Sequence, residues 1–241
     1  MPSSRVSQGT SRRALLVGAS RGLGLGLAKE LLHHGWSVVA TAREPGSEAL
    51  QTLAREQWGT IEIEGLDVAS SAATENFVRA MQNRAFDLLF LNAGVFGPEH
   101  QSVHLATAAE VNDLLLTNAF APVRLAYRLV ETVTPDSGVV AFMTSRLGSV
   151  AANTSGGMDL YRASKAALNS LSRGFAVSEA VTRRHLTVLS LHPGWVRTDM
   201  GGKGAPLDVA TSVRGLAEVL EARAGTGGHA FLDYQGNTIP W

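Results

Sequence analysis

Cysteine is absent from the 241-residue sequence. Its absence excludes disulfide bonds, thiolate nucleophiles and cysteine-bound metal ions, and it makes a reducing compartment, the cytoplasm, the expected location. A long apolar run is also missing, because no stretch approaches the ~20 residues that a membrane span requires. Residues 1–11 are polar and lack the apolar centre of a signal peptide, so we expect them to form a mobile N-terminal tail.

An excess of charge of either sign is missing too, since 21 basic residues are balanced by 21 acidic ones. This balance disfavours nucleic acid and anionic membranes as partners and predicts a small-molecule ligand. Among the seven histidines only His100 and His104 have helical spacing, and no carboxylate-rich neighbourhood supports a metal site. Because no linker or repeat divides the chain, residues 12–241 are predicted to form a single domain.

Short β-branched and apolar runs alternate with longer segments of helical periodicity. This alternation predicts an α/β, doubly wound Rossmann-type domain, with a mostly parallel sheet of six or seven strands and helices on both faces. The expected strands are Ala14–Val17, Trp36–Thr41, Ile61–Leu66, Phe86–Asn92, Gly138–Thr144, Leu186–Leu191 and Gly228–Leu232. The expected helices are Leu23–His33, Ser47–Gln57, Ala72–Asn83, Ala106–Val133, Asp159–Ala180 and Ala205–Ala222. Ligands of such a sheet bind beyond the carboxyl ends of its strands.

A glycine-rich turn follows the first expected strand. A strand, a glycine turn and a helix N-terminus together present free backbone N–H groups to a pyrophosphate. Gly18 would allow the tight turn, and Gly22 would let a phosphate approach the backbone closely. Gly24 would let the helix pack closely on the sheet. The expected phosphate-binding residues are Gly18, Ser20, Arg21, Gly22, Leu23 and Gly24. The G-x-x-x-G-x-G spacing alone leaves an ordinary glycine-rich turn as the alternative.

The end of the second expected strand indicates which dinucleotide binds. A carboxylate there would bond to the ribose 2′-hydroxyl of NAD, whereas an arginine accepts the 2′-phosphate of NADP. Ala42 offers no such bond, while Arg43 and Arg21 can clamp a phosphate between two guanidinium groups. We therefore expect NADP as the cofactor, with a solvated surface position as the alternative for Arg43.

Asp67 and Val68 follow the third expected strand and are expected next to the adenine. The Asp67 carboxylate could accept a hydrogen bond from the adenine amino group. It could equally cap the helix that is expected to begin near Ala69, and both interpretations stay open.

Tyr161 and Lys165 lie four residues apart in a segment with helical character, so their side chains share one helix face. The sequence has only three tyrosines and three lysines, and this spacing is therefore not expected by chance. A phenol with a pKa of ~10 transfers protons poorly at neutral pH unless positive charge nearby favours the phenolate. We expect Lys165 to supply that charge and Tyr161 to transfer a proton.

Further motifs follow one another in a characteristic order. They are Asn92-Ala93-Gly94 after the fourth strand, Asn118 in Leu-Thr-Asn-Ala-Phe, Ser145 in Thr-Ser-Arg-Leu-Gly, and Pro193-Gly194 with Thr198 beyond. Together with the glycine turn and the Tyr-x-x-x-Lys pair, they make residues 15–241 resemble the short-chain dehydrogenase/reductase family. The segment from Leu191 to Gly202 and the terminal Ile-Pro-Trp are similar to the C-factor-like and sniffer-like carbonyl reductases of that family.

The resemblance implies a catalytic set and further cofactor contacts. Ser145 would orient the substrate oxygen, Lys165 would hold the nicotinamide ribose, and Asn118, in a local helix kink, would hold a water that relays protons to Lys165. Asn92 is expected to be structural more than catalytic. The catalytic set is Asn118, Ser145, Tyr161 and Lys165, and the further cofactor contacts are Asn92, Ala93, Gly94, Tyr161, Lys165, Pro193, Gly194, Val196 and Thr198.

An apolar pocket is expected for the substrate, formed by Phe96, Leu147, Met158, Trp195 and Met200. The sixteen-residue spacing from Ser145 to Tyr161 is longer than usual in the family, so residues 151–159 are expected to bulge near the pocket. Arg146 would either attract an anionic substrate or form a structural salt bridge.

These observations predict an NADP-dependent oxidoreductase that reduces an aldehyde, ketone or quinone, with Tyr161 as the proton donor. The alternative is an NADP-responsive binding or signalling protein with little turnover on the same fold. A sugar-nucleotide epimerase or dehydratase is disfavoured, because little chain follows Thr198. The resemblance also implies a homodimer or homotetramer built on the long helices expected at 106–133 and 159–180.

Overall fold

The computed structural model describes residues 12–43 and 47–241; the N-terminal tail expected at residues 1–11 lies outside the described residues. Seven strands form one sheet with the order β3-β2-β1-β4-β5-β6-β7, and every neighbouring pair is parallel. The strands are β1 (Arg13–Val17), β2 (Ser37–Ala42), β3 (Ile61–Gly65), β4 (Leu88–Leu91), β5 (Val139–Met143), β6 (Thr187–His192) and β7 (His229–Asp233). The predicted doubly wound Rossmann-type fold is confirmed, and the sheet is parallel throughout.

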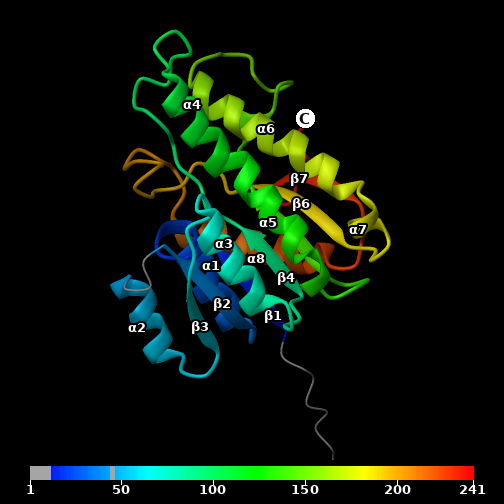
Figure 1. The fold of residues 1–241 in the computed structure, drawn as a ribbon. Helices are drawn as coiled ribbons and strands as arrows, with labels where there is room; N and C mark the ends of the chain where they lie inside the picture. The colour runs from blue at the N-terminus through cyan, green and yellow to red at the C-terminus, as the bar shows by residue number, and fades with distance from the viewer. Residues whose placement is uncertain (1–11, 44–46) are drawn as a thin grey trace, which may run out of the picture.

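Helices cover both faces of the sheet (Figure 1). The helical segments are α1 (Gly22–His33), α2 (Glu48–Glu56), α3 (Ser71–Met81), α4 (Ala108–Leu115), η1 (Leu116–Phe120), α5 (Ala121–Leu129), η2 (Val130–Thr132), η3 (Arg146–Gly148), α6 (Asp159–Ala176), α7 (Glu179–Thr182) and α8 (Val209–Arg223). No helix in this described part of the chain is long and apolar enough to cross a membrane.

The strands β1, β2, β4, β5 and β6 are largely buried on both faces, and their alternate residues belong to two separate cores. In β1, Leu15 and Val17 pack with α3, α5 and α6, whereas Ala14 and Leu16 pack with α1, α2 and α8. This is why these strands are almost continuously apolar, whereas glutamate and isoleucine alternate in the edge strand β3. The sheet is thereby held rigidly between two helical layers.

Three predicted helices differ from the structure. The helix expected at 106–133 is interrupted by the π-helical turn η1, and the one expected at 159–180 ends at Ala176 before the separate short helix α7. The last helix begins at Val209 instead of Ala205, because Leu207 forms a short bridge with Val196 and the Asp208 side chain caps the helix.

Phe142 tests how much the two-layer packing contributes to stability. The side chain is fully buried on β5 and meets the Phe175 ring of α6 edge to face, with ring centroids 5.9 Å apart. We expect Phe142→Ala to lower the free energy of unfolding by about 3–5 kcal/mol, since it leaves a cavity that the sheet cannot close. Chemical denaturation measures this. Trp58→Ala is the control, because Trp58 is 89% exposed, and a smaller loss at Phe142 than at Trp58 would contradict the assignment.

Candidate active site

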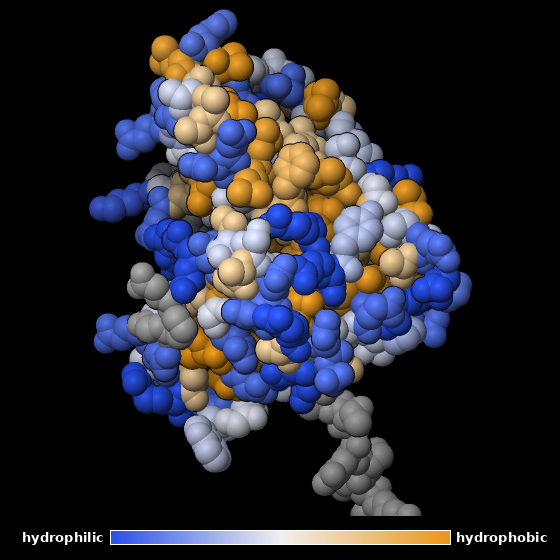
Figure 2. Space-filling model, viewed as in Figure 1, coloured by the Kyte–Doolittle hydropathy of each residue, from blue (hydrophilic) through white to orange (hydrophobic). Residues whose placement is uncertain are grey.

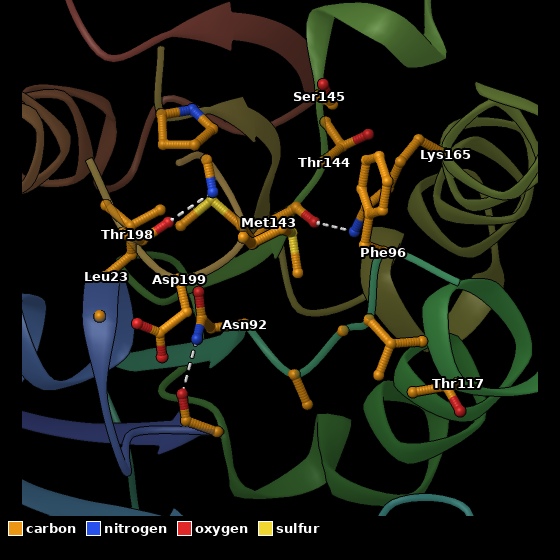
Figure 3. A pocket seen from close by; sticks show the side chains of 18 of the residues that line it. Leu23, Asn92, Phe96, Thr117, Met143, Thr144, Ser145, Lys165, Thr198 and Asp199 are labelled. Carbon is orange, nitrogen blue, oxygen red and sulfur yellow. Dashed lines mark hydrogen bonds between the residues drawn. The ribbon is translucent and has the colours of Figure 1, made fainter. Parts of the chain in front are cut away.

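A cavity of about 870 Å³ opens beyond the carboxyl ends of the strands. Its wall is built from the turns that follow β1 to β6, and Figure 3 shows side chains from several of these turns facing one another across it. Every predicted cofactor and substrate residue except Gly24 lines this cavity. Of the predicted catalytic set, Ser145, Tyr161 and Lys165 line it, and Asn118 does not. The sequence motifs therefore converge on one site.

The glycine turn is held tightly against β4. Gly18 has a φ of +90°, and its N–H donates to Thr41 Oγ1 at 3.0 Å. The Asn92 amide donates to the Gly18 carbonyl oxygen at 2.6 Å, which confirms a structural role for Asn92 (Figure 3). Gly24 lies behind the turn, where a Cβ atom would collide with that same carbonyl oxygen. Gly24 therefore serves close packing and does not line the cavity, unlike the other residues expected to bind phosphate.

Arg43 and Arg21 reach the cavity from the turns after two neighbouring strands. Arg43 follows β2 and is exposed, and Arg21 lies in the glycine turn. Arg21 forms an ion pair with Asp199, a residue of the loop after β6. The two guanidinium groups therefore line one cavity, as a phosphate clamp requires, but Arg21 already has a carboxylate partner. Because that pair is highly exposed, it is weak and leaves Arg21 able to exchange partners.

Asp67 does not cap α3. Its Oδ1 accepts a hydrogen bond from the Ala69 N–H at 3.0 Å and tightens the turn, while the Ser70 side chain caps the helix by accepting from Ala73 N–H. The capping interpretation of Asp67 is therefore wrong. The exposed carboxylate lines the cavity next to Val68, where the adenine contact was expected.

Tyr161 and Lys165 occupy one face of α6 as their spacing predicts. Lys165 Nζ lies 5.8 Å from the Tyr161 ring centroid and donates a hydrogen bond to the Met143 carbonyl oxygen at 3.0 Å (Figure 3). Burial raises the pKa of Tyr161 to about 12 and lowers the pKa of Lys165 to about 8. The expected lowering of the tyrosine pKa is therefore not found, because desolvation outweighs the attraction of the ammonium.

Ser145 lies two residues beyond the end of β5 and caps the short turn η3. Its Oγ accepts a hydrogen bond from the Leu147 N–H at 3.1 Å, so the hydroxyl hydrogen can still be donated. The side chain is buried in the protein yet borders the cavity. This geometry suits the predicted donor to a substrate oxygen.

Asn118 is fully buried within the π-helical turn η1, so the helix kink expected there is present. Its Oδ1 accepts from the Val95 N–H at 2.8 Å, and its Nδ2 donates to the Val95 carbonyl oxygen and to Ser164 Oγ. These bonds use both donors of the amide, and two of the three join it to the backbone of Val95, so the side chain supports the loop after β4. The water relay to Lys165 stays a prediction.

The expected substrate pocket is apolar at its wall. The Phe96 ring lies 5.4 Å from the Tyr161 ring, and Met158 brings the residues of the expected bulge to the cavity edge. Trp195 and Met200 are half exposed, and the Trp195 indole N–H donates to the Gly201 carbonyl oxygen. This edge of the cavity is therefore open to solvent.

Arg146 borders the cavity next to Ser145. Within the described ranges 12–43 and 47–241, Arg146 forms no ion pair within 4.0 Å, so the structural salt bridge considered for it is not found.

His192 is a further wall residue that the motifs did not single out. Burial, with a smaller effect of Arg146, lowers the pKa of His192 to about 4, so this imidazole is uncharged at neutral pH.

Gln101 is another residue that sequence reasoning missed. It is buried in the loop after β4 and forms hydrogen bonds both within that loop and with the start of α6. A single glutamine in a loop carries no motif, and its partners lie up to 60 residues away in the sequence. Only the folded chain brings them together.

With this geometry established, comparison with known proteins identifies the family. The sequence profile of the short chain dehydrogenases matches residues 12–206. The chain belongs to the short-chain dehydrogenase family. The resemblance drawn from the motifs is thereby confirmed.

Three relatives refine the family assignment. The C-signal protein of Myxococcus xanthus is 40% identical over 156 residues, which are 64% of this chain and 92% of that protein. A carbonyl reductase of Pseudomonas aeruginosa, crystallised with NADP, is 42% identical, with a TM-score of 0.86 over 96% of this chain and all of that one. The Sniffer carbonyl reductase of Drosophila melanogaster is 32% identical, with a TM-score of 0.85 over the same shares of the two chains. The predicted branch is thus confirmed.

Arg43 allows a direct test of cofactor choice in this short-chain dehydrogenase. We expect Arg43→Asp to shift the preference from NADPH towards NADH, because it removes a charge-assisted contact and adds repulsion to the 2′-phosphate. Fluorescence titration with both dinucleotides measures the shift. The matched control is Arg79→Asp, because Arg79 lies on the exposed face of α3. Equal binding of NADH and NADPH by the unaltered protein would refute the predicted role of Arg43.

Proposed function

We propose that this short-chain dehydrogenase is an NADP-dependent carbonyl reductase that converts an aldehyde, ketone or quinone to the alcohol. The observation that carries the proposal is the shared cavity: Ser145, Tyr161 and Lys165 line the same space as the glycine turn and Arg43. A dinucleotide and a carbonyl substrate bound together in this cavity would therefore lie next to the proton-transfer groups. The NADP complex of the similar Pseudomonas carbonyl reductase supports the same cofactor here.

The residues present fit the cofactor. The glycine turn offers backbone N–H groups at the N-terminus of α1, and Gly18 and Gly22 keep side chains away from that surface. Arg43 and Arg21 would hold the 2′-phosphate, Asp67 and Val68 the adenine, and Lys165 the nicotinamide ribose. Pro193, Gly194, Val196 and Thr198 line the same cavity from the loop after β6. When bound, NADPH supplies the hydride that reduction requires.

Tyr161 is suited to donate the proton of a reduction. Its raised pKa, about 12, keeps the phenol protonated at neutral pH, so a proton is available for the oxygen of a carbonyl substrate. Ser145 would orient that oxygen with its free hydroxyl hydrogen. The Lys165 ammonium, once it contacts the ribose, would also stabilise the phenolate that remains after the transfer.

The wall chemistry favours an apolar or aromatic carbonyl compound. Phe96, Leu147 and Met158 form an apolar surface next to Tyr161, and Trp195 and Met200 border it from the other side. Such a surface would exclude a sugar, whose hydroxyl groups would lose their hydrogen bonds to water. The unpaired Arg146 adds a positive group at the cavity wall, so carbonyl compounds with a carboxylate belong in the test panel.

A signalling role without turnover is the second candidate, and the name of the Myxococcus relative, C-signal, is the observation that favours it. In that case dinucleotide occupancy would be the output, and proton transfer would be unnecessary. This chain nevertheless retains Ser145, Tyr161 and Lys165 around the cavity. Reduction of carbonyl compounds is therefore the better supported function.

Tyr161 and Lys165 provide the decisive test. We expect Tyr161→Phe to lower the steady-state rate at least ~10²-fold while NADPH affinity stays nearly unchanged, because only the proton-donating oxygen is lost. Lys165→Met should weaken both rate and NADPH affinity, since the ammonium serves both. NADPH consumption across aldehydes, ketones, diketones and quinones, with fluorescence titration of NADPH, measures these effects.

Matched controls come from residues outside the cavity. Tyr127→Phe on α5 and Lys29→Met on α1 repeat the same substitutions at partly or fully exposed positions and should keep the unaltered rates. More than a tenth of the activity remaining in Tyr161→Phe would mean that another group donates the proton. An unaltered protein that binds NADPH tightly yet reduces no compound of the panel would favour the signalling role.

We further propose that the protein acts in the cytoplasm as a homodimer or homotetramer. Phe120 in η1 and Tyr127 on α5 leave about half of their aromatic surface exposed, at 53% and 46%. They lie on the outer helix layer, where apolar residues gather on the face seen in Figure 2. A two-fold contact between copies would bury these rings.

Sedimentation velocity tests this assembly. We expect a dimer or tetramer at micromolar concentration and a shift towards monomer in Phe120→Asp, because the new carboxylate would be buried without a partner. Trp58→Asp is the control, as its ring is 89% exposed. A monomer at that concentration in the unaltered protein would rule out the predicted assembly.

A further inference from the structure

The helix that carries Tyr161 has no N-terminal cap of its own. Met158 occupies the cap position of α6 in a left-handed conformation, with a φ of 52°, and its side chain accepts no hydrogen bond. The first N–H groups of a helix lack partners inside the helix and must find them elsewhere. Tyr161 lies within this first turn, so the position of its backbone depends on the group that accepts its N–H.

Gln101 supplies that partner from another part of the chain. Its Oε1 accepts the Tyr161 N–H at 2.9 Å, and its backbone carbonyl oxygen accepts the Leu160 N–H at 3.4 Å. Gln101 itself is 7% exposed and has a φ of 51°, a conformation that a glutamine rarely adopts. The surrounding contacts must therefore hold it firmly in place.

The other end of the same amide holds the substrate wall. Gln101 Nε2 donates to the carbonyl oxygens of Phe96 and Pro98, at 2.9 and 2.7 Å. Phe96 lines the cavity and faces the Tyr161 ring. One side chain thus uses its acceptor for the catalytic helix and both donors for the loop after β4. A glutamate lacks the donors, and a methionine lacks donors and acceptor alike.

We propose that Gln101 is a positioning residue that fixes the Tyr161 hydroxyl relative to the Phe96 wall of the substrate pocket. This inference rests on the proposed function, because it assigns Gln101 to the same proton transfer. Gln101 does not line the cavity and acts through Tyr161 and Phe96. Its loss should alter the geometry of proton transfer and leave the adenine half of the site untouched.

Two variants of similar size separate the roles of the amide. Gln101→Met removes all three side-chain hydrogen bonds, and Gln101→Glu keeps the acceptor for the Tyr161 N–H but loses the donors. We expect kcat to fall ~10–100-fold in Gln101→Met, since a shift of about 1 Å in a reacting group can cost 10²-fold. The kcat of Gln101→Glu should lie between those of Gln101→Met and the unaltered protein. The NADPH Kd of both variants should stay within about threefold of the unaltered value.

The control is Gln82→Met, at the exposed end of α3, which should leave kcat unchanged. A kcat in Gln101→Met within twofold of the unaltered protein would overturn the inference. Equal losses of kcat and NADPH affinity would overturn it too, because they would indicate general damage to the fold instead of a displaced tyrosine.

A second measurement needs no turnover. Absorbance at the phenolate wavelength, taken as the difference from Tyr161→Phe in the same background, follows the ionisation of Tyr161 alone. Gln101→Met should shift that ionisation to lower pH, because a loosened first turn admits water and relieves the burial that raises the tyrosine pKa. An unchanged ionisation would refute the positioning role. Absence of any carbonyl reduction by the unaltered protein would instead defeat the proposed function, and this titration would still test Gln101.

Discussion

All seven strands of the described sheet run in one direction, and this constraint places every functional turn at the same edge. The strand order changes direction at β1, with β2 on one side and β4 on the other, so the turns after these strands diverge and leave space between them. The glycine turn after β1 fits that space because the Asn92 amide holds the Gly18 carbonyl oxygen and Thr41 accepts a hydrogen bond from the Gly18 N–H. Hydrogen bonds from the Asn92 and Ala93 N–H groups to the Val17 carbonyl oxygen also join the glycine turn to the end of β4.

Burial sets the chemistry of the two central groups in opposite directions. Desolvation disfavours the charged form of each group, which raises the pKa of Tyr161 and lowers the pKa of Lys165. The Met143 carbonyl oxygen partly compensates the lysine by accepting its hydrogen bond. The site therefore holds a protonated phenol next to a desolvated ammonium. Ribose hydroxyl groups at Lys165 would give that ammonium further hydrogen-bond partners, and cofactor binding and proton donation would then be coupled through this one residue.

The sequence predicted the features that short-range patterns determine. Most strand positions followed from apolar runs because β1, β2, β4, β5 and β6 are largely buried on both faces, and Tyr161 and Lys165 followed from helical spacing. The remaining features depend on contacts between distant segments. The kink at Asn118 was expected from the family resemblance alone, because no local pattern indicates the bonds to Val95 and Ser164 that stabilise the π-helical turn. The predicted direction of the Tyr161 pKa shift was wrong, because burial raises this pKa. The spacing of Tyr161 and Lys165 can be read from the sequence, but the depth to which they are buried cannot.

The two sides of the pocket differ in how firmly they are held, and this difference bears on substrate range. Behind Ser145, the turn η3 is tied to the C-terminus, where Ser149 Oγ donates to the Pro240 carbonyl oxygen and the Ala151 N–H to that of Trp241. Trp195 and Met200, by contrast, are half exposed on a loop that the weak Arg21–Asp199 pair joins to the glycine turn. Since a 2′-phosphate would compete for Arg21, cofactor binding would weaken this link between the loop and the glycine turn. A change in the pocket on cofactor binding would therefore affect the wall of Trp195 and Met200 before the wall behind Ser145.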